Sequence, residues 1–192
     1  MAADTTSVDP ASVDPERIVL PRNSLVVLVG PAGSGKSTFA AAFFGPTQVV
    51  SSDECRALIS DDASNQQVSS HAFELMHLLI EKRLLLGRLT VCDATNLEPG
   101  ARRSLMRLAR RFGFSAIAIV FDLDLETCIR RNAGRRRVVP EDALFHQHGM
   151  FEKAKAAVLR EGFDQVIVLR QSSNQDLVVK ISPRAKIRSG MS

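Results

Sequence analysis

The sequence predicts an α/β fold in which a parallel sheet is flanked by helices. Strand-like and helical segments alternate along its 192 residues. Some strand-like segments, such as residues 116–121, are apolar throughout, as expected for strands that are covered on both faces. A glycine-rich stretch, GPAGSGKST at residues 30–38, joins the first strand to a helix. A chain of this length can form one domain with a substantial core.

The first part of this domain contains two predicted strands and three predicted helices. Residues 24–29 predict a buried strand because a short, β-branched apolar run ends at a glycine. The helix predicted at 37–44 ends at a Gly-Pro pair, and a short strand follows at 48–51. Residues 54–59 predict one or two helical turns. The mostly apolar residues 70–86 predict a long helix that ends at a glycine.

The second part continues the alternation. Residues 89–92 predict the third strand, before the fourth at 116–121. Residues 98–112 between them predict an amphipathic helix. Residues 125–132 and 140–161 predict two more helices, the second begun by its proline, and 165–169 predict the last strand. The basic face of the amphipathic helix carries Arg103, Arg107, Arg110 and Arg111.

The stretch GPAGSGKST spells G-x-x-x-x-G-K-[ST], the pattern of a loop that binds the phosphates of a nucleoside triphosphate. We expect Lys36 to reach the β- and γ-phosphates of ATP and the Ser37 hydroxyl to ligate Mg²⁺. Asp93, directly after a strand, has the position of the acid that holds Mg²⁺, although it could instead cap a helix. The candidate nucleotide-binding residues are Gly30, Ala32, Gly33, Ser34, Gly35, Lys36, Ser37 and Thr38.

The stretch SSDECR, residues 51–56, offers an acid and a cation for a phosphate acceptor. It follows the second strand, and parallel sheets bind ligands at the carboxyl ends of their strands. Asp53 could take a proton from an acceptor hydroxyl, while Arg56, three residues on, could bind an acceptor phosphate. The alternative is that Asp53 only caps a helix and that Arg56 is solvated.

The arginine run RRNAGRRR, residues 130–137, lies between two predicted helices, where such folds carry a lid over the triphosphate. Arg131 and Arg135 are four residues apart and could present two guanidinium groups to the phosphates. We interpret Arg130, Arg136 and Arg137 as exposed. The whole run could equally be an exposed basic face.

Taken together, these segments resemble the kinase module of the bacterial polynucleotide kinase-phosphatase family. The resemblance rests on GPAGSGKSTFA, SSDECR, VCDATN, and RRNAGR followed by VVP and Gln147, and it covers about residues 25–169. It implies a P-loop kinase fold with an arginine-bearing lid. It also implies transfer of the γ-phosphate of ATP to the 5′-hydroxyl end of DNA or RNA in nucleic-acid repair.

The resemblance also implies roles for single residues. Asp53 matches the general base, and Arg56 matches the residue that binds the acceptor's phosphate. Lys36 and Ser37 match the ATP and Mg²⁺ ligands. The lid arginines match Arg131 and Arg135. In that family the kinase is joined to phosphatase and ligase modules, whereas little follows residue 169 here, so we expect possible separate phosphatase or ligase partners.

Other features of the sequence set the domain organisation. We expect a disordered leader at 1–22, a P-loop kinase domain at 23–170 with its lid around 131–150, and a basic tail at 171–192. The net charge is +4, and basic segments in a protein that binds phosphates suggest a polyanionic ligand, although charge alone favours a solvated face. No segment predicts a membrane span or a signal peptide. The three cysteines form no paired pattern, so we expect a cytoplasmic protein.

Two alternatives to the polynucleotide kinase stay open at this point. The same loop, acid and lid serve kinases of small hydroxylated molecules, such as sugars, nucleosides or antibiotics. The chain could also be a nucleotide-dependent switch with little transfer activity, although this alternative gives Asp53 no role. The sequence makes no prediction about oligomeric state.

Overall fold

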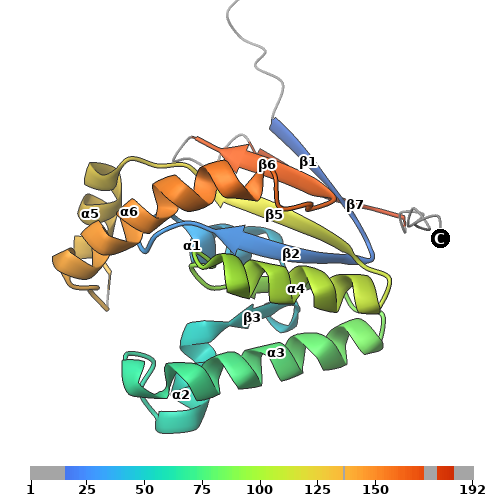
Figure 1. The fold of residues 1–192 in the computed structure, drawn as a ribbon, viewed down its shortest axis with the longest axis horizontal. Coiled ribbons are helices and arrows are strands. Elements are labelled where there is room, and N and C mark those ends of the chain that lie inside the picture. Colours follow the sequence, from blue (N-terminus) through green and yellow to red (C-terminus); the bar gives the residue numbers. More distant parts are fainter. Residues whose placement is uncertain (1–15, 136, 171–176, 184–192) are drawn as a thin grey trace, which may run out of the picture.

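The structure is a computed structural model that describes residues 16–135, 137–170 and 177–183. Its central sheet is parallel, with the strand order β3-β4-β2-β5-β6, which confirms the predicted α/β class (Figure 1). Each strand predicted from the sequence is present within a few residues of its expected position. The strands of this sheet are β2 (Ser24–Val29), β3 (Val49–Ser51), β4 (Thr90–Asp93), β5 (Ser115–Phe121) and β6 (Gln165–Leu169).

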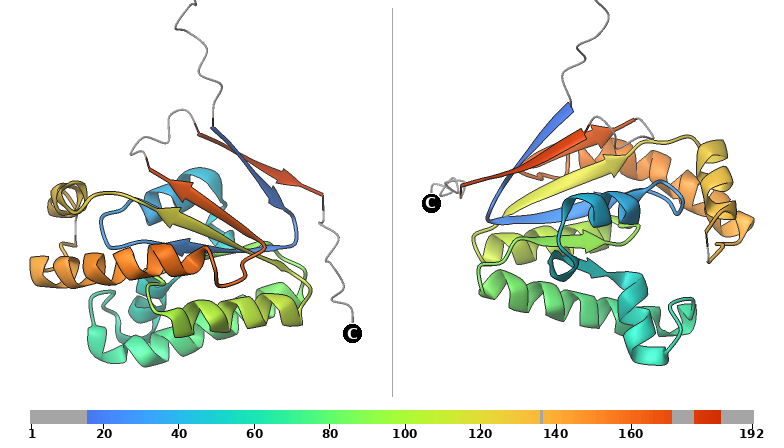
Figure 2. Two further views of the ribbon diagram at one scale, coloured as in Figure 1. Left: turned by 45° about the horizontal axis from the view of Figure 1, so that its top comes forward. Right: turned by 180° about the vertical axis from the view of Figure 1, so that it is seen from behind.

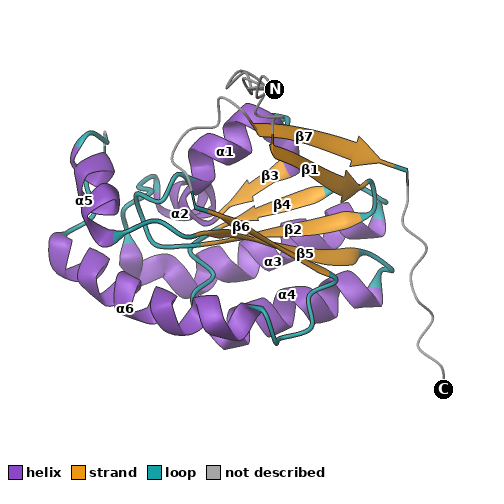
Figure 3. Ribbon diagram, turned by 90° about the horizontal axis from the view of Figure 1, so that it is seen from above, coloured by secondary structure: helices purple, strands orange, loops and turns teal. Residues whose placement is uncertain are grey.

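Helices connect these strands and cover both faces of the sheet. The α-helices are α1 (Lys36–Phe43), α2 (Ser52–Ser60), α3 (Ser69–Leu85), α4 (Pro99–Arg111), α5 (Leu125–Ala133) and α6 (Glu141–Val158). Short 3₁₀ turns lie at Pro46–Gln48 and Gln66–Val68. Figure 3 shows α3, α4 and α6 on one side of the sheet and α1 on the other. No helix among the described residues is long and apolar enough to cross a membrane.

The alternation of side chains along β2 explains why the sheet needs both layers. Leu25, Val27 and Val29 join the core under α3, α4 and α6. Val26 and Leu28 join the second core, which contains Phe39 of α1 and Cys128 of α5. Because successive side chains of a strand point to opposite faces, an entirely apolar strand is stable only when both faces are covered.

The structure differs from the sequence prediction at both ends of the domain. Residues 16–21, expected in the leader, form β1 (Glu16–Pro21), and residues 177–182, expected in the tail, form β7 (Leu177–Ser182). The two strands pair in parallel and lie on the α1 side of the main sheet (Figures 2 and 3). Ile18 and Leu20 of β1 are buried in the second core. Their pairing partner is far away in the sequence, so no local turn signal marks them as a strand.

Most of the remaining residues of the predicted leader and tail lie outside the described residues. This concerns residues 1–15, 171–176 and 184–192, which include the basic residues Arg184, Lys186 and Arg188. The helices follow their predictions more closely. The helix expected at 54–59 begins earlier, at Ser52, because the Ser51 side chain accepts hydrogen bonds from the first free backbone N–H groups.

Candidate active site

The glycine loop connects β2 to α1 at the carboxyl edge of the sheet. Gly33 and Gly35 have φ angles of 77° and 95°, in the left-handed region that favours glycine. A Cβ atom on Gly33 would lie 2.3 Å from the carbonyl oxygen of Cys128 in α5, so a side chain has no room there. Gly35 is the N-cap residue of α1. The free N–H groups of this helix end therefore face the position that an anion would take.

Lys36, the first residue of α1, folds back over the loop. Its Nζ donates hydrogen bonds to the Pro31 carbonyl (2.7 Å) and to Ser34 Oγ (3.3 Å). The residue is only 7% exposed. Burial lowers the pKa of Lys36 to about 8; the nearby Asp93 carboxylate opposes this shift, whereas the Arg135 guanidinium adds to it. Because burial removes water from this ammonium group, a bound polyphosphate would strongly stabilise its charged form.

Ser37 and Asp93 are the two candidate metal ligands, and both line the same cavity. Ser37 is exposed at the start of α1, and Asp93 is the buried last residue of β4. No cluster of three or more His, Cys, Asp or Glu residues suited to a metal exists among the described residues. One hydroxyl and one carboxylate fit Mg²⁺, because this ion keeps several waters and takes its other ligands from substrate phosphates.

The loop that follows Asp93 is held by buried polar groups. Gly30 donates its N–H to the Thr95 carbonyl (3.1 Å), and Asn96 Nδ2 donates to the Leu28 carbonyl (2.7 Å). Arg102 of α4, fully buried, donates to the carbonyls of Asn96 and Leu97 and forms a two-point ion pair with Glu161 (2.5 and 2.7 Å). The sequence analysis did not single out Arg102, because nothing in the local pattern marks it as the one buried arginine of this helix.

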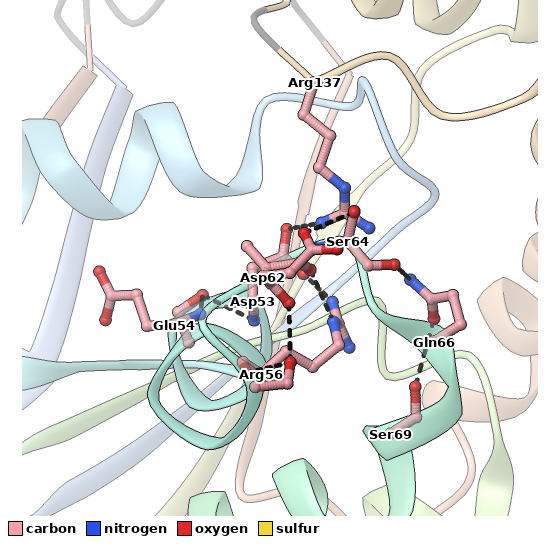
Figure 4. A network of polar contacts seen from close by, with 11 residues as sticks. Asp53, Glu54, Arg56, Asp62, Ser64, Gln66, Ser69 and Arg137 are labelled. Atoms are coloured by element: carbon pink, nitrogen blue, oxygen red, sulfur yellow. Dashed lines mark hydrogen bonds and ion pairs between the residues drawn. The ribbon is translucent and has the colours of Figure 1, made fainter.

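Asp53 and Arg56 lie next to each other at the start of α2 (Figure 4). Ser51 is the N-cap, accepting hydrogen bonds from the N–H groups of Asp53 and Glu54, so the Asp53 carboxylate is not used as a cap. Asp53 Oδ1 instead accepts a hydrogen bond from Arg56 Nη2. Arg56 is 6% exposed and also donates to the Ala63 carbonyl (2.9 Å). Neither half of the alternative, a capping aspartate beside a solvated arginine, describes this geometry.

Arg137 corrects one interpretation of the arginine run, since it is not simply an exposed basic residue. Its Nη1 donates to Asp53 Oδ2 at 2.8 Å, and its side chain is 31% exposed. Figure 4 shows Arg137 reaching the Asp53 carboxylate from a different segment than α2. Burial lowers the pKa of Arg56, and the positive charge of Arg137 adds to this shift. Asp53 is therefore held between two arginines. Its contact with Arg137 joins residues 84 positions apart, and no local sequence pattern reveals it.

The other arginines of the run have different surroundings. The Nη1 atom of Arg131 would lie 3.4 Å from a Cβ atom placed on Gly35, so this guanidinium borders the glycine loop. Arg135 lies close enough to lower the pKa of Lys36. Arg130 is exposed and donates to Thr127 Oγ1 (3.3 Å) in its own helix. Arg136 lies outside the described residues.

Two cavities meet at this site. The smaller, of about 340 Å³, is lined by residues 33–38 together with Arg131 and Arg135. The larger, of about 640 Å³, holds Asp53, Arg56, Asp93 and Arg137 in its wall. Both cavities are lined by Lys36, Ser37 and Arg135. A group bound at these three residues is therefore accessible from either side.

The larger cavity also has an apolar side. Its remaining wall includes Phe73, Val138, Val139, Pro140 and Ala143. Gln147 of α6 lines it as well, and its Oε1 accepts a hydrogen bond from the Ala32 N–H of the glycine loop (2.8 Å). The segment that carries the arginines is thus tied both to the glycine loop, through Gln147, and to α2, through Arg137.

Comparison with known proteins identifies a family and a fold. The model of a family described as AAA domain matches residues 25–154. No curated protein matches the chain in sequence. A chain in the structure of the Pnkp1/Rnl/Hen1 RNA repair complex is similar, with a TM-score of 0.60 and 20% identity over 79% of this chain and 49% of that one.

Two further solved structures share the fold. A chain in the structure of AvrRxo1-ORF1:-ORF2 with ATP has a TM-score of 0.56 and 15% identity, covering 72% of this chain and 50% of that one. The Mycobacterium tuberculosis APS kinase CysC in complex with AMPPNP and APS has a TM-score of 0.50 and 18% identity, covering 79% of this chain and 91% of that one. The chain thus spans about half of the first two relatives and most of the third.

Proposed function

We propose a function for this chain from the premise of its family: the chain belongs to the AAA domain family. Its P-loop fold is shared with kinases. We infer that the chain is an ATP-dependent phosphotransferase that transfers the γ-phosphate of ATP to the 5′-hydroxyl end of DNA or RNA. One observation carries this proposal: two cavities meet at Lys36, Ser37 and Arg135, and the second contains an acid beside two arginines.

The smaller cavity is the proposed ATP site. Its wall consists of the glycine loop, whose N–H groups would bind phosphate oxygens, with Lys36, Arg131 and Arg135 adding positive charge. Two of the similar structures contain ATP or AMPPNP. Ser37 and Asp93 would hold Mg²⁺, whose chemistry is to neutralise charge on the β- and γ-phosphate oxygens. The arginine segment, around residues 131–150, would act as the lid over the triphosphate.

The larger cavity is the proposed acceptor site, where Asp53 acts as the general base. The acceptor oxygen attacks the γ-phosphorus and forms a new P–O bond, while the bond to the β–γ bridging oxygen breaks and ADP leaves. The hydroxyl proton goes to the Asp53 carboxylate. A carboxylate has about four lone-pair positions, so Asp53 can accept this proton while it is hydrogen-bonded to Arg56 and Arg137. Lys36, Arg131 and Arg135 stabilise the charge of the phosphoryl group during transfer.

The wall of the larger cavity supports a nucleotide as the acceptor. Phe73 and Val138 belong to an apolar side that a base could contact, while Arg56 is a cation for a phosphate. In nucleic-acid repair the 5′-phosphate product would be passed on, so separate phosphatase or ligase partners form part of the proposal. The similar chain in an RNA repair complex supports this view.

A small hydroxylated molecule is the second candidate acceptor. The observation that favours it is the similarity to an APS kinase over 91% of that protein's chain, whereas the match covers only half of the chain from the RNA repair complex. A nucleotide-dependent switch is the remaining alternative, and it predicts ATP binding without transfer.

One assay separates these candidates. The purified chain is incubated with γ-labelled ATP and with a 5′-hydroxyl RNA, a 5′-hydroxyl DNA, the same strands carrying a 5′-phosphate, a nucleoside, a sugar and APS. We expect label only on the 5′-hydroxyl strands and none with Lys36→Ala. Label on the nucleoside, sugar or APS in preference to the strands would identify a small-molecule kinase. If the protein binds ATP but no acceptor becomes labelled, the chain is a nucleotide-dependent switch.

A further inference from the structure

The exposed face of α4 is a strongly charged helix surface that the proposed chemistry leaves without a role. It carries Arg103, Arg107, Arg110 and Arg111, and α4 contains no acidic residue. At 100° per residue these four positions fall within about a quarter to a third of a turn, so they share one face. We call these four residues the α4 basic face.

The α4 basic face is not neutralised in the way that a solvated helix surface usually is. The side chains of Arg103 and Arg107 form no hydrogen bond or ion pair with the described part of the chain, and Glu98 at the N-cap is the acid nearest to them in the sequence. Arg111 forms an ion pair with Glu81 (3.5 Å), and the Arg110 side chain donates to the Gly162 carbonyl (2.8 Å) and to no other group among the described residues. Arginines at spacings of three and four residues repel one another and destabilise the free helix. Such an arrangement points to an anionic partner that is absent from the free protein.

The position of α4 connects this face to the larger cavity. Ala94 and Thr95, which line that cavity, lie in the loop between Asp93 and α4. From there α4 runs back along the sheet, away from the strands' carboxyl ends (Figure 1). Buried Arg102 ties the helix to the carbonyls of this loop, so the basic face has a fixed position relative to the cavity. From Arg103 to Arg111 it extends about 12 Å.

We propose that the α4 basic face binds the phosphates of a nucleic-acid strand whose 5′ end lies in the larger cavity. This inference rests on the proposed polynucleotide acceptor and adds a binding surface to it. The arginines contact the backbone rather than the bases, so the surface adds affinity for longer strands without sequence preference. A strand too short to leave the cavity gains nothing from it.

The test compares two variants of the full chain that each lose two positive charges. Arg103→Gln/Arg107→Gln changes the α4 basic face. Arg22→Gln/Lys180→Gln is the matched control, because both residues are exposed and belong to the β1–β7 side, opposite α4. Binding of fluorescent 5′-hydroxyl RNA strands of about three and about 12 nucleotides is measured by anisotropy between about 50 and 200 mM salt. Melting temperatures show whether both variants are folded.

We expect the α4 variant to bind the longer strand roughly tenfold more weakly than wild type near 200 mM salt, with a salt slope smaller by about 1.4. The short strand and the control variant should show no change. Equal losses in both variants, or a wild-type affinity that does not depend on strand length, would overturn the inference. So would equally tight binding of polyglutamate, which would make an acidic protein the partner. Because this test measures binding and not transfer, a failure of the α4 inference can be distinguished from a failure of the proposed kinase activity.

Discussion

The two cavities that meet at Lys36 are built in different ways. The smaller one consists mainly of contiguous residues, 33–38, whose positions follow from glycine geometry and from the start of a helix. The larger one is assembled from several separate segments that are joined by contacts such as Asp53–Arg137. The proposed ATP side is therefore preformed by the backbone, whereas the proposed acceptor side depends on charge pairs between residues that are distant in the sequence.

The largest effect should come from the backbone-built side. Lys36→Ala removes the cation that serves both cavities, and the loss of one such preorganised contact raises a barrier by about 3 kcal/mol or more. We expect transfer to fall by more than a hundredfold while the melting temperature stays near that of wild type. Initial rates with γ-labelled ATP and a 5′-hydroxyl strand measure this. A folded Lys36→Ala protein with near wild-type rates would contradict the assignment of the phosphate loop.

A smaller effect is expected on the side that depends on charge pairs. Arg137→Ala leaves Asp53 with Arg56 as its remaining arginine contact, so the carboxylate loses part of its orientation. We expect kcat to fall by roughly tenfold to a hundredfold, with ATP affinity unchanged. Arg137→Lys should recover part of the rate. Arg130→Ala is the matched control from the same run, since Arg130 donates to Thr127 Oγ1 in its own helix and is not among the residues that line the two cavities. Equal effects of the two alanine variants would show that Arg137 acts only as part of an exposed basic face.

The smallest effect concerns the protonation of Lys36. With a pKa of about 8 in the free protein, Lys36 is mostly neutral at higher pH, and a bound triphosphate favours its charged form. ATP binding near pH 8.5 should therefore take up a fraction of a proton, and none through this group near pH 6.5. Calorimetry in buffers with different ionisation enthalpies detects the uptake. A binding enthalpy at high pH that does not depend on the buffer would show that Lys36 is already charged.

The same shift affects the stability of the free protein. The folded-state pKa lies below the ordinary value of 10.5, so the unfolded chain binds this proton more tightly. Charged Lys36 therefore costs stability below about pH 8, and this cost disappears as the pH rises from about 8 to 10.5.

The same contrast explains what could be predicted from the sequence. The strands of the main sheet and the glycine loop follow from local signals, namely apolar runs, glycines and caps, and the structure has them where they were expected. β1 and β7 were missed because each is a short strand whose partner lies more than a hundred residues away. The contact of Arg137 with Asp53 and the buried position of Arg102 depend on tertiary packing. The roles of Asp53, Arg56, Arg131 and Arg135 remain predictions.

The central claim is that Asp53 accepts the proton of an acceptor hydroxyl, and Asp53→Asn tests it most directly. Asparagine has nearly the same shape and keeps one oxygen that can accept a hydrogen bond from Arg56 or Arg137, but it cannot take up the proton. Glu54→Gln is the matched control, because it neutralises the neighbouring exposed acid in the same turn of α2. ATP binding, melting temperature and transfer to a 5′-hydroxyl strand are measured on one preparation of each protein.

We predict that Asp53→Asn keeps ATP binding and its fold but loses transfer by a factor of about 10² to 10⁴, whereas Glu54→Gln transfers at the wild-type rate. Transfer that survives in Asp53→Asn would show that the base lies elsewhere. Loss of ATP binding along with transfer would place Asp53 in the metal site. Either result would contradict the account.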